Sequence, residues 1–378
     1  MINALKNELA INLKNIYGWK TGRKIVVISV DDYGNVRLDS KKARENMDRE
    51  GAKIKSRFDA YDSLENREDL EMLYEALSSV KDKNGKHAVF TPFTMSCNIN
   101  YEAMAEDNNR EYIPELLPDT YRKLEAINPD AYRGSWDLWK EGIDKELMAP
   151  QFHGREHLNL KVFREKLAKK DPSVLLALKN RSYTSIPDTG YSTINFPAAF
   201  EFWDFKENES FREIILDGLQ AFEKVYGYKA TYFNPPGGRE HHAIHEYLNE
   251  GGIKYMDTGW VKTEHQGHGK YKRIFSYSGR KNKFGQTFMV RNAVFEPADG
   301  KSIDWVEFTL KQVEAAFRWN RPAVISTHRV NFCGNIDPAN REKGITALKA
   351  LLQKIVKRWP DVEFMGASQL LDIISKSK

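Results

Sequence analysis

The sequence predicts an α/β fold built on a parallel sheet that closes as a barrel. Short apolar runs alternate with amphipathic helical segments along most of the chain, which is the pattern of repeated βαβ units. No internal repeat and no Pro/Gly/Ser-rich linker divides the 378 residues, so we expect one large domain. Hydrophobic residues make up 41% and charged residues 29%, close to ordinary globular usage.

The elements of the first half are identified by their apolar patterns. The β-branched run "KIVVISV" (24–30) predicts a buried strand that ends before Asp31. A helix is expected over "REDLEMLYEALSSVKDKNG" (67–85), closed by Gly85. Further strands are expected in "KHAVFTPFTMS" (86–96) and "KELMAPQF" (145–152).

The second half continues the alternation. In "FREIILDGLQAFEKVYG" (211–227) apolar residues recur at helical spacing and Gly227 is a typical C-terminal stop. Further helices are expected over 303–319 and, carrying Ile345 to Trp359, near the C-terminus. Strands are expected in "KATYFNPP" (229–236), "IKYMDTG" (253–259), "PAVIST" (322–327) and "VEFM" (362–365).

The N-terminal segment (1–22) is predicted to form an amphipathic helix outside the domain of residues 23–378. Its apolar positions at helical spacing are Ile2, Leu5, Leu9, Leu13 and Ile16. Such a helix is typical of a segment laid on the domain, with a peripheral membrane contact as the alternative. The segment lacks the apolar core of a signal peptide, and Cys97 and Cys333 form no disulfide framework, so a cytoplasmic location is expected.

The formal charge of +5 is interpreted as a solvated basic surface, because the excess is spread along the chain, and no nucleic-acid partner is expected.

Side chains with acid/base or metal-binding capacity follow several of the predicted strands. Asp31 and Asp32 follow the first strand, and His153, Asp257 and His328 follow or close later ones. In parallel α/β folds the carboxyl ends of the strands meet at one rim, where active sites lie. The five side chains are therefore expected to converge on one site.

The stretch "HGREH" places His153 and His157 four residues apart, a spacing that permits both to bind one metal ion. Adjacent strand residues point to opposite faces, so Asp31 and Asp32 both reach one site only if the strand breaks, which "DDYGN" favours. Two imidazoles and one carboxylate leave open positions on zinc, as in hydrolytic sites.

The segments "SVDDYG", "HGREH", "FNPPGG", "MDTGW" and "ISTHRV", in this order, resemble the five motifs of the NodB-like polysaccharide deacetylases, carbohydrate esterase family 4. The resemblance implies a distorted (β/α) barrel over about residues 23–375. It also implies a divalent metal ion, with zinc expected and Co, Mn or Ni as alternatives. The roles that it implies are Asp31 as base, Asp32, His153 and His157 as metal ligands, His328 as acid, Asp257 as the group that orients His328, and the Gly237 backbone N–H as oxyanion donor.

The chain departs from the family pattern at two motif positions. Asn234 stands where the third motif has an Arg that holds the catalytic Asp, and Arg239 or Arg155 are the candidate replacements. Gly154 stands where the histidine motif has Ser or Thr. Trp136 and Trp139, in an insertion, are expected to pack in the core, with a sugar platform as the alternative. The expected substrate-binding residues are Tyr33, Asn234, Pro236, Arg239 and Trp260.

The predicted function is metal-dependent removal of an acyl group, N-acetyl in the first instance, from a carbohydrate. The expected substrates are an oligosaccharide, a nucleotide sugar or a lipid-linked glycan. One alternative is a barrel that binds a glycan without turnover, since the motif Arg is missing. Another is an H-x-x-E-H zinc peptidase with Glu156 as base, which requires both histidines on one helix. His241, His242 and His245 are interpreted as residues of a solvated helix, with a second metal site as the alternative.

Overall fold

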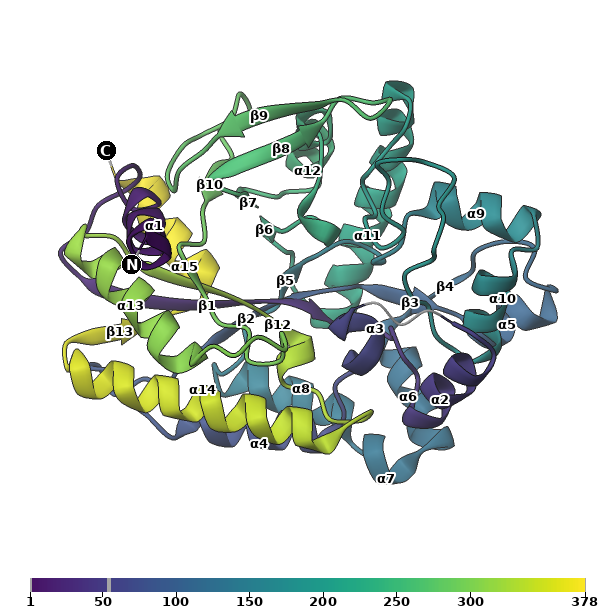
Figure 1. Cartoon of the computed structure of the whole chain (residues 1–378), viewed down its shortest axis with the longest axis horizontal. Coiled ribbons are helices and arrows are strands. Elements are labelled where there is room, and N and C mark those ends of the chain that lie inside the picture. Colours follow the sequence, from purple (N-terminus) through teal and green to yellow (C-terminus); the bar gives the residue numbers. More distant parts are fainter. Residues whose placement is uncertain (1, 53–55, 378) are drawn as a thin grey trace.

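A curled parallel sheet organises the chain into a distorted (β/α) barrel (Figure 1). The computed structural model describes residues 2–52 and 56–377. Within them the strand order is β10-β7-β6-β5-β2-β1-β12-β11, and β13 pairs with the first residues of β1. All of these pairings are parallel, so the carboxyl ends of the strands lie along one rim.

The strands differ greatly in length. The central strand β1 (Lys24–Tyr33) is buried from Ile25 onward and pairs with β12 (Ala323–His328) over six residues. The others are short: β2 (Phe90–Thr94), β5 (Gln151–Phe152), β6 (Tyr232–Phe233), β7 (Tyr255–Asp257), β10 (Thr287–Met289), β11 (Ala293–Val294) and β13 (Val362–Phe364).

Helices cover both faces of the sheet (Figure 1). One layer consists of α13 (Trp305–Arg318), α14 (Pro338–Arg358), α4 (Arg67–Ser78) and α8 (Ser135–Asp144), which contact one another in this order. The opposite side includes α11 (Phe211–Tyr226), α12 (His245–Glu250) and α15 (Ala367–Lys376). Apart from the N-terminal helix α1, the remaining α-helices are α2 (Lys41–Arg49), α3 (Arg57–Tyr61), α5 (Tyr101–Glu106), α6 (Leu117–Ile127), α7 (Pro129–Tyr132), α9 (Leu160–Ala168) and α10 (Pro172–Lys179).

Two antiparallel hairpins interrupt the βα alternation. One pairs β3 (Cys97–Ile99) with β4 (Pro114–Leu116). The other pairs β8 (Val261–His265) with β9 (Tyr271–Phe275) and lies above β7 and β10 in Figure 1. The sequence patterns predicted neither hairpin, nor the short strands β10 and β11.

The other predicted helices and strands are present, but some are shorter than predicted: α4 ends at Ser78 rather than at Gly85, and the strand predicted over 145–152 is limited to Gln151–Phe152. Helix α11 ends at Gly227, whose φ of +77° is the left-handed conformation that favours glycine at a helix end. The predicted insertion tryptophan Trp139 is fully buried, and its indole N–H donates to Glu65 and Tyr121. Trp136 packs against the same core, so core packing is confirmed over a sugar platform.

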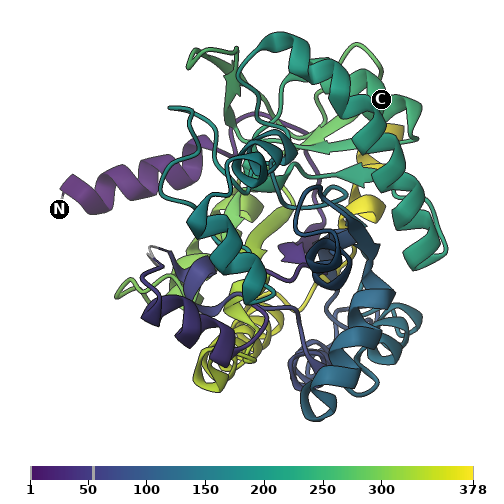
Figure 2. The same ribbon diagram turned by 90° about the vertical axis from the view of Figure 1, so that its right-hand side faces the viewer.

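The N-terminal helix α1 (Ile2–Leu13) contacts α13 near its C-terminal end and projects from the body of the protein (Figure 2). The Trp319 indole donates to Asn12 Oδ1 at 2.9 Å. Leu9 is 59% exposed, so the helix is only partly laid on the domain. The side chains of Ile2 and Leu5 lie outside the described residues. In the described part of the chain, no helix combines the length and the apolarity needed to cross a bilayer.

Candidate metal and catalytic site

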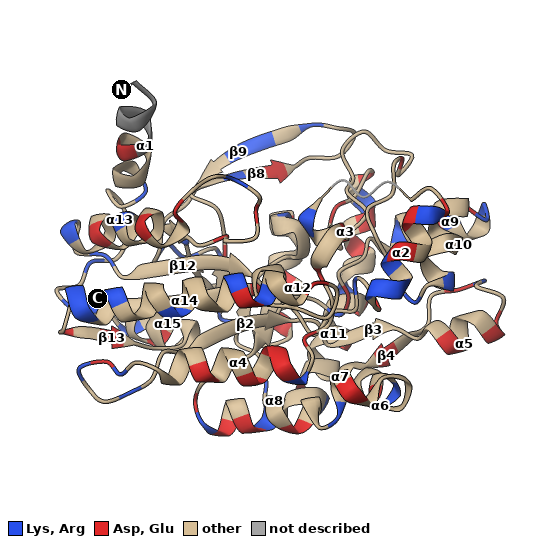
Figure 3. Cartoon of the chain, turned by 60° about the horizontal axis from the view of Figure 1, so that its bottom comes forward, with Lys and Arg blue, Asp and Glu red and all other residues tan. Residues whose placement is uncertain are grey.

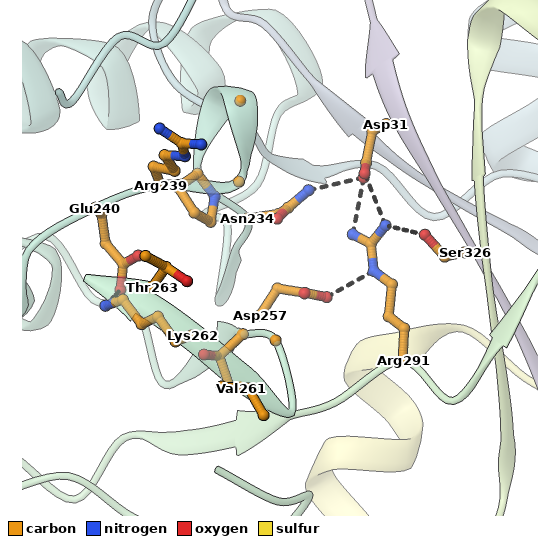
Figure 4. Close-up of a pocket in the computed structure, with 15 residues that line it drawn as sticks. Asp31, Asn234, Arg239, Glu240, Asp257, Val261, Lys262, Thr263, Arg291 and Ser326 are labelled. Carbon is orange, nitrogen blue, oxygen red and sulfur yellow. Dashed lines mark hydrogen bonds and ion pairs between the residues drawn. The ribbon is translucent and has the colours of Figure 1, made fainter. Parts of the chain in front are cut away.

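The carboxyl ends of β1, β6, β7, β10 and β12 border one cavity of about 410 Å³ (Figure 4). Strand β1 brings Asp31, β6 is followed by Asn234, β7 ends at Asp257, and β10 is followed by Arg291. His153 follows β5 and His328 ends β12 at the same rim, but Asp32, His153, His157 and His328 are not among the residues that line this cavity. The rim thus assembles residues that are up to about 300 positions apart in the sequence.

Three predicted metal ligands lie together at this rim. Asp32 Oδ1 is 3.4 Å from His153 Nε2 and 3.1 Å from His157 Nε2. All three side chains are buried, and each offers one ligand atom within 4.8 Å of the others. This arrangement is consistent with three protein ligands on a divalent ion.

The expected break in strand β1 is present at Asp32. Its φ of +75° is unusual for a residue other than glycine, and the register between β1 and β2 shifts between Val30 and Tyr33. The break turns the Asp32 carboxylate to the histidines while Asp31 keeps its place beside β12. Both carboxylates therefore reach the site.

Hydrogen bonding leaves His153 able to bind a metal through Nε2, and burial favours the neutral form of His157. His153 Nδ1 lies 2.7 Å from the carbonyl oxygen of Asn234, so it carries the proton and leaves the Nε2 lone pair free. Burial lowers the pKa of His157 despite the nearby Asp32 carboxylate, so His157 is neutral at pH 7. Burial would raise the pKa of Asp32, but its contacts with the two histidines hold it well below its usual value.

Asp31 is held by Arg291 and Asn234 (Figure 4). The Arg291 guanidinium donates to both Asp31 oxygens, at 2.8 Å to Oδ1 and 2.7 Å to Oδ2. Asn234 Nδ2 donates to Oδ1 at 2.7 Å. Burial alone would raise the pKa of Asp31, but the adjacent guanidinium lowers it, so the carboxylate is ionised.

Arg291 is the arginine that holds Asp31. The expectation that Arg239 or Arg155 does so was wrong. Arg239 pairs with Glu201 at 2.9 Å, and Arg155 pairs with Glu156 at 2.6 Å. Neither is hydrogen-bonded to Asp31. The cation that holds Asp31 follows β10, two strands away from β6, which precedes Asn234.

The expectation that Asp257 orients His328 was also wrong. The Asp257 carboxylate accepts from Arg291 Nε at 2.8 Å and from the Tyr232 hydroxyl at 2.8 Å. Burial raises its pKa although Arg291 opposes the change. Asp257 therefore fixes Arg291, which in turn fixes Asp31.

His328 is oriented by Glu296, which follows β11. His328 Nδ1 lies 2.6 Å from Glu296 Oε1, and Nε2 lies 3.8 Å from Asp31 Oδ2. Burial opposes protonation, but the Glu296 carboxylate raises the pKa of His328 to about 9. Since Asp31 and His328 are also register partners on β1 and β12, a carboxylate base and a protonated imidazole face the same point.

We expect Glu296→Gln to shift the alkaline limb of the pH–rate profile toward lower pH by at least about one unit, because an adjacent opposite charge shifts a pKa by about 1–3 units. His328 holds its proton below a pKa of about 9, so catalysis that needs the imidazolium falls as pH rises through that value. The measurement is kcat/KM against pH. Glu342→Gln, on the exposed surface of α14, is the control, and an unchanged alkaline limb in Glu296→Gln would contradict the role of Glu296.

Of the remaining predicted residues, Gly237 and Arg239 line the cavity. Gly237 has a φ of +71° and approaches Ala198 so closely that a Cβ would lie 3.0 Å from the Ala198 Cβ. Tyr33 was wrongly expected to bind substrate, because its ring is buried against Trp139.

Pro236 and Trp260 are likewise not among the cavity-lining residues. Pro236 is buried over Gly154, where a Cβ would meet its Cγ at 3.0 Å. This contact, together with the φ of +119° at Gly154, explains why glycine replaces Ser or Thr in the histidine motif. Trp260 packs edge-on against Phe275.

The zinc-peptidase alternative is contradicted by the local structure. Residues 153–159 are not helical, so His153 and His157 do not share a helix face. Glu156, the base that this alternative needs, is buried and bonded to Arg155 and Tyr112.

In the second histidine group, His241 and His245 do not form the pair that their spacing permits, but His241, His242 and Glu264 offer ligand atoms within 4.8 Å of one another, so a second metal site stays a prediction. His245 Nε2 lies 3.1 Å from Glu240, whereas His241 and His242 approach Glu264 at 3.6 and 3.0 Å. His241 Nδ1 accepts the Ala243 backbone N–H, so its proton lies on Nε2 and faces Glu264. The solvated-helix interpretation is wrong for His241 and His245, which are buried, and holds for His242.

The sequence reasoning missed Arg291 and Glu296. A signal was present in "FMVRNAVFEP" (288–297), where these two charged residues interrupt an otherwise largely apolar stretch. A buried charge is costly unless it is paired, so an Arg within such a run indicates a specific carboxylate partner.

No family model matches the chain, and no curated protein matches it. Solved structures do match, at low identity. A 4-alpha-glucanotransferase from Thermococcus litoralis is 13% identical, with a TM-score of 0.45; the match covers 93% of this chain, which spans only 40% of that one.

Two further solved structures match over more of their own length. A protein described as a polysaccharide deacetylase from Mycobacterium smegmatis is 13% identical over 95% of this chain and 92% of that one, with a TM-score of 0.43. One described as a glycoside hydrolase/deacetylase from Parabacteroides distasonis is 11% identical over 95% and 72%, with a TM-score of 0.49.

Proposed function

We propose that the protein is a metal-dependent hydrolase that removes an acyl group, N-acetyl in the first instance, from a carbohydrate. One observation carries the proposal: the ligand atoms of Asp32, His153 and His157 converge beside an ionised Asp31, which faces His328 at 3.8 Å. Ligand set, base and acid thus occupy one rim.

The donor set fits a divalent ion of the zinc type, with Co, Mn or Ni as alternatives. Neutral imidazole nitrogens and a carboxylate are the ligands that zinc takes in catalytic sites. His153 is fixed by the Asn234 carbonyl, the kind of outer contact that orients metal-binding histidines. An ion held there would act as a Lewis acid on the acyl oxygen and lower the pKa of water.

The chain's own residues supply the proton transfers. Asp31 Oδ1 accepts two hydrogen bonds, whereas Oδ2 accepts one from Arg291 Nη1. A carboxylate oxygen has two lone-pair sites, so Oδ2 keeps one that can take the proton of the attacking water. His328, protonated below a pKa of about 9, then gives a proton to the departing amine. The Gly237 backbone N–H is the proposed oxyanion donor.

Arg291 removes the argument for a barrel that binds a glycan without turnover. That alternative rested on the missing motif Arg at Asn234. A guanidinium nevertheless holds both oxygens of Asp31, so the base is positioned from another strand. Hydrolysis is therefore favoured over binding alone.

The test is acetate release from N-acetylated oligosaccharides by protein supplied with Zn²⁺, Co²⁺, Mn²⁺ or Ni²⁺. Asp31→Asn is expected to retain the metal and to lose about 10²–10⁴-fold in kcat, the usual contribution of a general base. Glycan binding by the wild type without any acetate release would contradict hydrolysis and favour the binding barrel.

A further inference from the structure

The cavity at the strand ends is electrically balanced. Its acidic and basic lining residues are equal in number: Asp31, Glu240 and Asp257 against Arg239, Lys262 and Arg291. Each base has a carboxylate partner, since Arg291 pairs with both aspartates, Lys262 with Glu240, and Arg239 with Glu201. Such a cavity suits an uncharged polar group such as an N-acylated sugar ring.

A second cavity, of about 300 Å³, adjoins the first and shares Thr258 and Lys262 with it. The β8–β9 hairpin stands between the two. Paired residues of an antiparallel hairpin point to the same face. Val261 and Thr263 line the first cavity, whereas Ile274 and Glu264 line the second.

The second cavity is strongly positive. It is lined by Lys262, Arg280, Lys281 and Lys283, with Glu264 as its only acidic lining residue. Glu264 lies 3.3 Å from Lys262, which also pairs with Glu240, and 3.0 Å from His242 Nδ1, so the net positive charge of this cavity comes from Arg280, Lys281 and Lys283. In the described part of the chain, Arg280, Lys281 and Lys283 form no ion pair with a carboxylate.

This charge belongs to an unusual segment of the sequence. Between Glu264 and Glu296 there is no Asp or Glu, while seven residues are Lys or Arg. The whole chain has 58 basic and 53 acidic residues, so these seven exceed its net charge of +5. The excess is therefore concentrated here rather than spread evenly, and Figure 3 shows the basic residues of β9, which belongs to this segment.

We propose that the substrate is an anionic carbohydrate, which places its acylated sugar in the balanced cavity and a phosphate or carboxylate group in the second one. The inference rests on the proposed function and names its substrate class. Three unpaired cations favour an anion, and the apolar wall of Ile274, Phe284 and Phe288 suits the non-polar face of an attached ring. Lys262 and Thr258 line both cavities, so they lie where the acylated sugar and the anionic group would meet.

The test compares N-acetylglucosamine, N-acetylglucosamine 1-phosphate and a hyaluronan tetrasaccharide, in which the anion is absent, a phosphate or a carboxylate. The zinc-loaded wild type is expected to show at least about tenfold higher kcat/KM for one anionic compound than for the neutral sugar. Lys281→Glu combined with Lys283→Glu is expected to reduce that preference about tenfold or more, through KM rather than kcat. The compound that shows the effect identifies phosphate or carboxylate as the recognised group.

The control is Lys41→Glu combined with Lys42→Glu, which changes the net charge equally on the exposed surface of α2. It should leave the preference intact, since long-range steering alone would affect both variants. Turnover without any anionic preference, or equal effects of the two double variants, would overturn the inference and leave the hydrolase intact.

A calorimetric titration separates the inference from the proposed function. Zinc-loaded Asp31→Asn protein is titrated with each of the three sugars. If no sugar is hydrolysed by the wild type, the proposed function fails. Tighter binding of an anionic sugar that disappears on Lys281→Gln with Lys283→Gln would still support the second cavity, whereas equal binding of all three would overturn it.

Discussion

A His153→Ala, His157→Ala double variant is expected to bind no stoichiometric divalent ion and to lose about 10³-fold or more in kcat. A metal Lewis acid contributes several kcal/mol to the transition state, and each 1.36 kcal/mol is about tenfold in rate. With both imidazoles gone, Asp32 is the only member left of the three-residue ligand group. Metal content is measured by mass spectrometry of dialysed protein, and kcat by acetate release.

The matched control is His268→Ala. His268 is a histidine of the β8–β9 turn, and its side chain is 59% exposed. It should retain the metal and the activity of the wild type. Full metal content in the double variant, with an unchanged melting temperature, would contradict the proposed ligand set.

Arg291→Met is expected to lower stability by about 3–5 kcal/mol, because removing one partner of a buried ion pair leaves uncompensated charge. The guanidinium is bonded to both Asp31 and Asp257, and all three side chains are nearly buried. Without the cation the pKa of Asp31 rises. The acid limb of the pH–rate profile should therefore move to higher pH, and urea denaturation should give the loss of stability.

The double variant Arg291→Met, Asn234→Arg tests whether a guanidinium at the other position restores what Arg291→Met loses. The double variant places a guanidinium on Asp31 from the position at which the NodB-like motif has its Arg. It is expected to recover part of the stability and to return the acid limb toward that of the wild type. If Arg291→Met alone leaves both quantities unchanged, Arg291 does not hold the base.

The barrel was predictable because its core strands and helices have strong local patterns. The strand β1 is an almost unbroken β-branched run, and α11 has one apolar face ended by Gly227. Strands β5, β6 and β11 have two residues each, too few to show a period. Strand β9 is exposed at four of its five residues and shows no regular alternation of apolar and polar residues, so no buried face marks it in the sequence.

The grouping of Asp32, His153 and His157 was predictable because Asp32 and His153 stand at the ends of predicted strands and the two histidines share a short motif. Arg291 and Glu296 were not predicted, because their partners are distant in the sequence: Arg291 and Asp31 are 260 residues apart. The carboxylate that orients His328 follows β11 instead of ending β7, where the motif predicted it. The guanidinium that holds Asp31 follows β10 instead of β6. Only the tertiary structure shows which cation meets which carboxylate.

The most direct test of the central claim is the titration of Zn²⁺ into EDTA-treated wild-type protein, with acetate release measured at each step. We predict that activity rises from near zero and saturates at one ion per chain, with no rise in the His153→Ala, His157→Ala variant. Full activity in the metal-free protein, or equal activation of the double variant, would contradict a metal-dependent site at Asp32, His153 and His157.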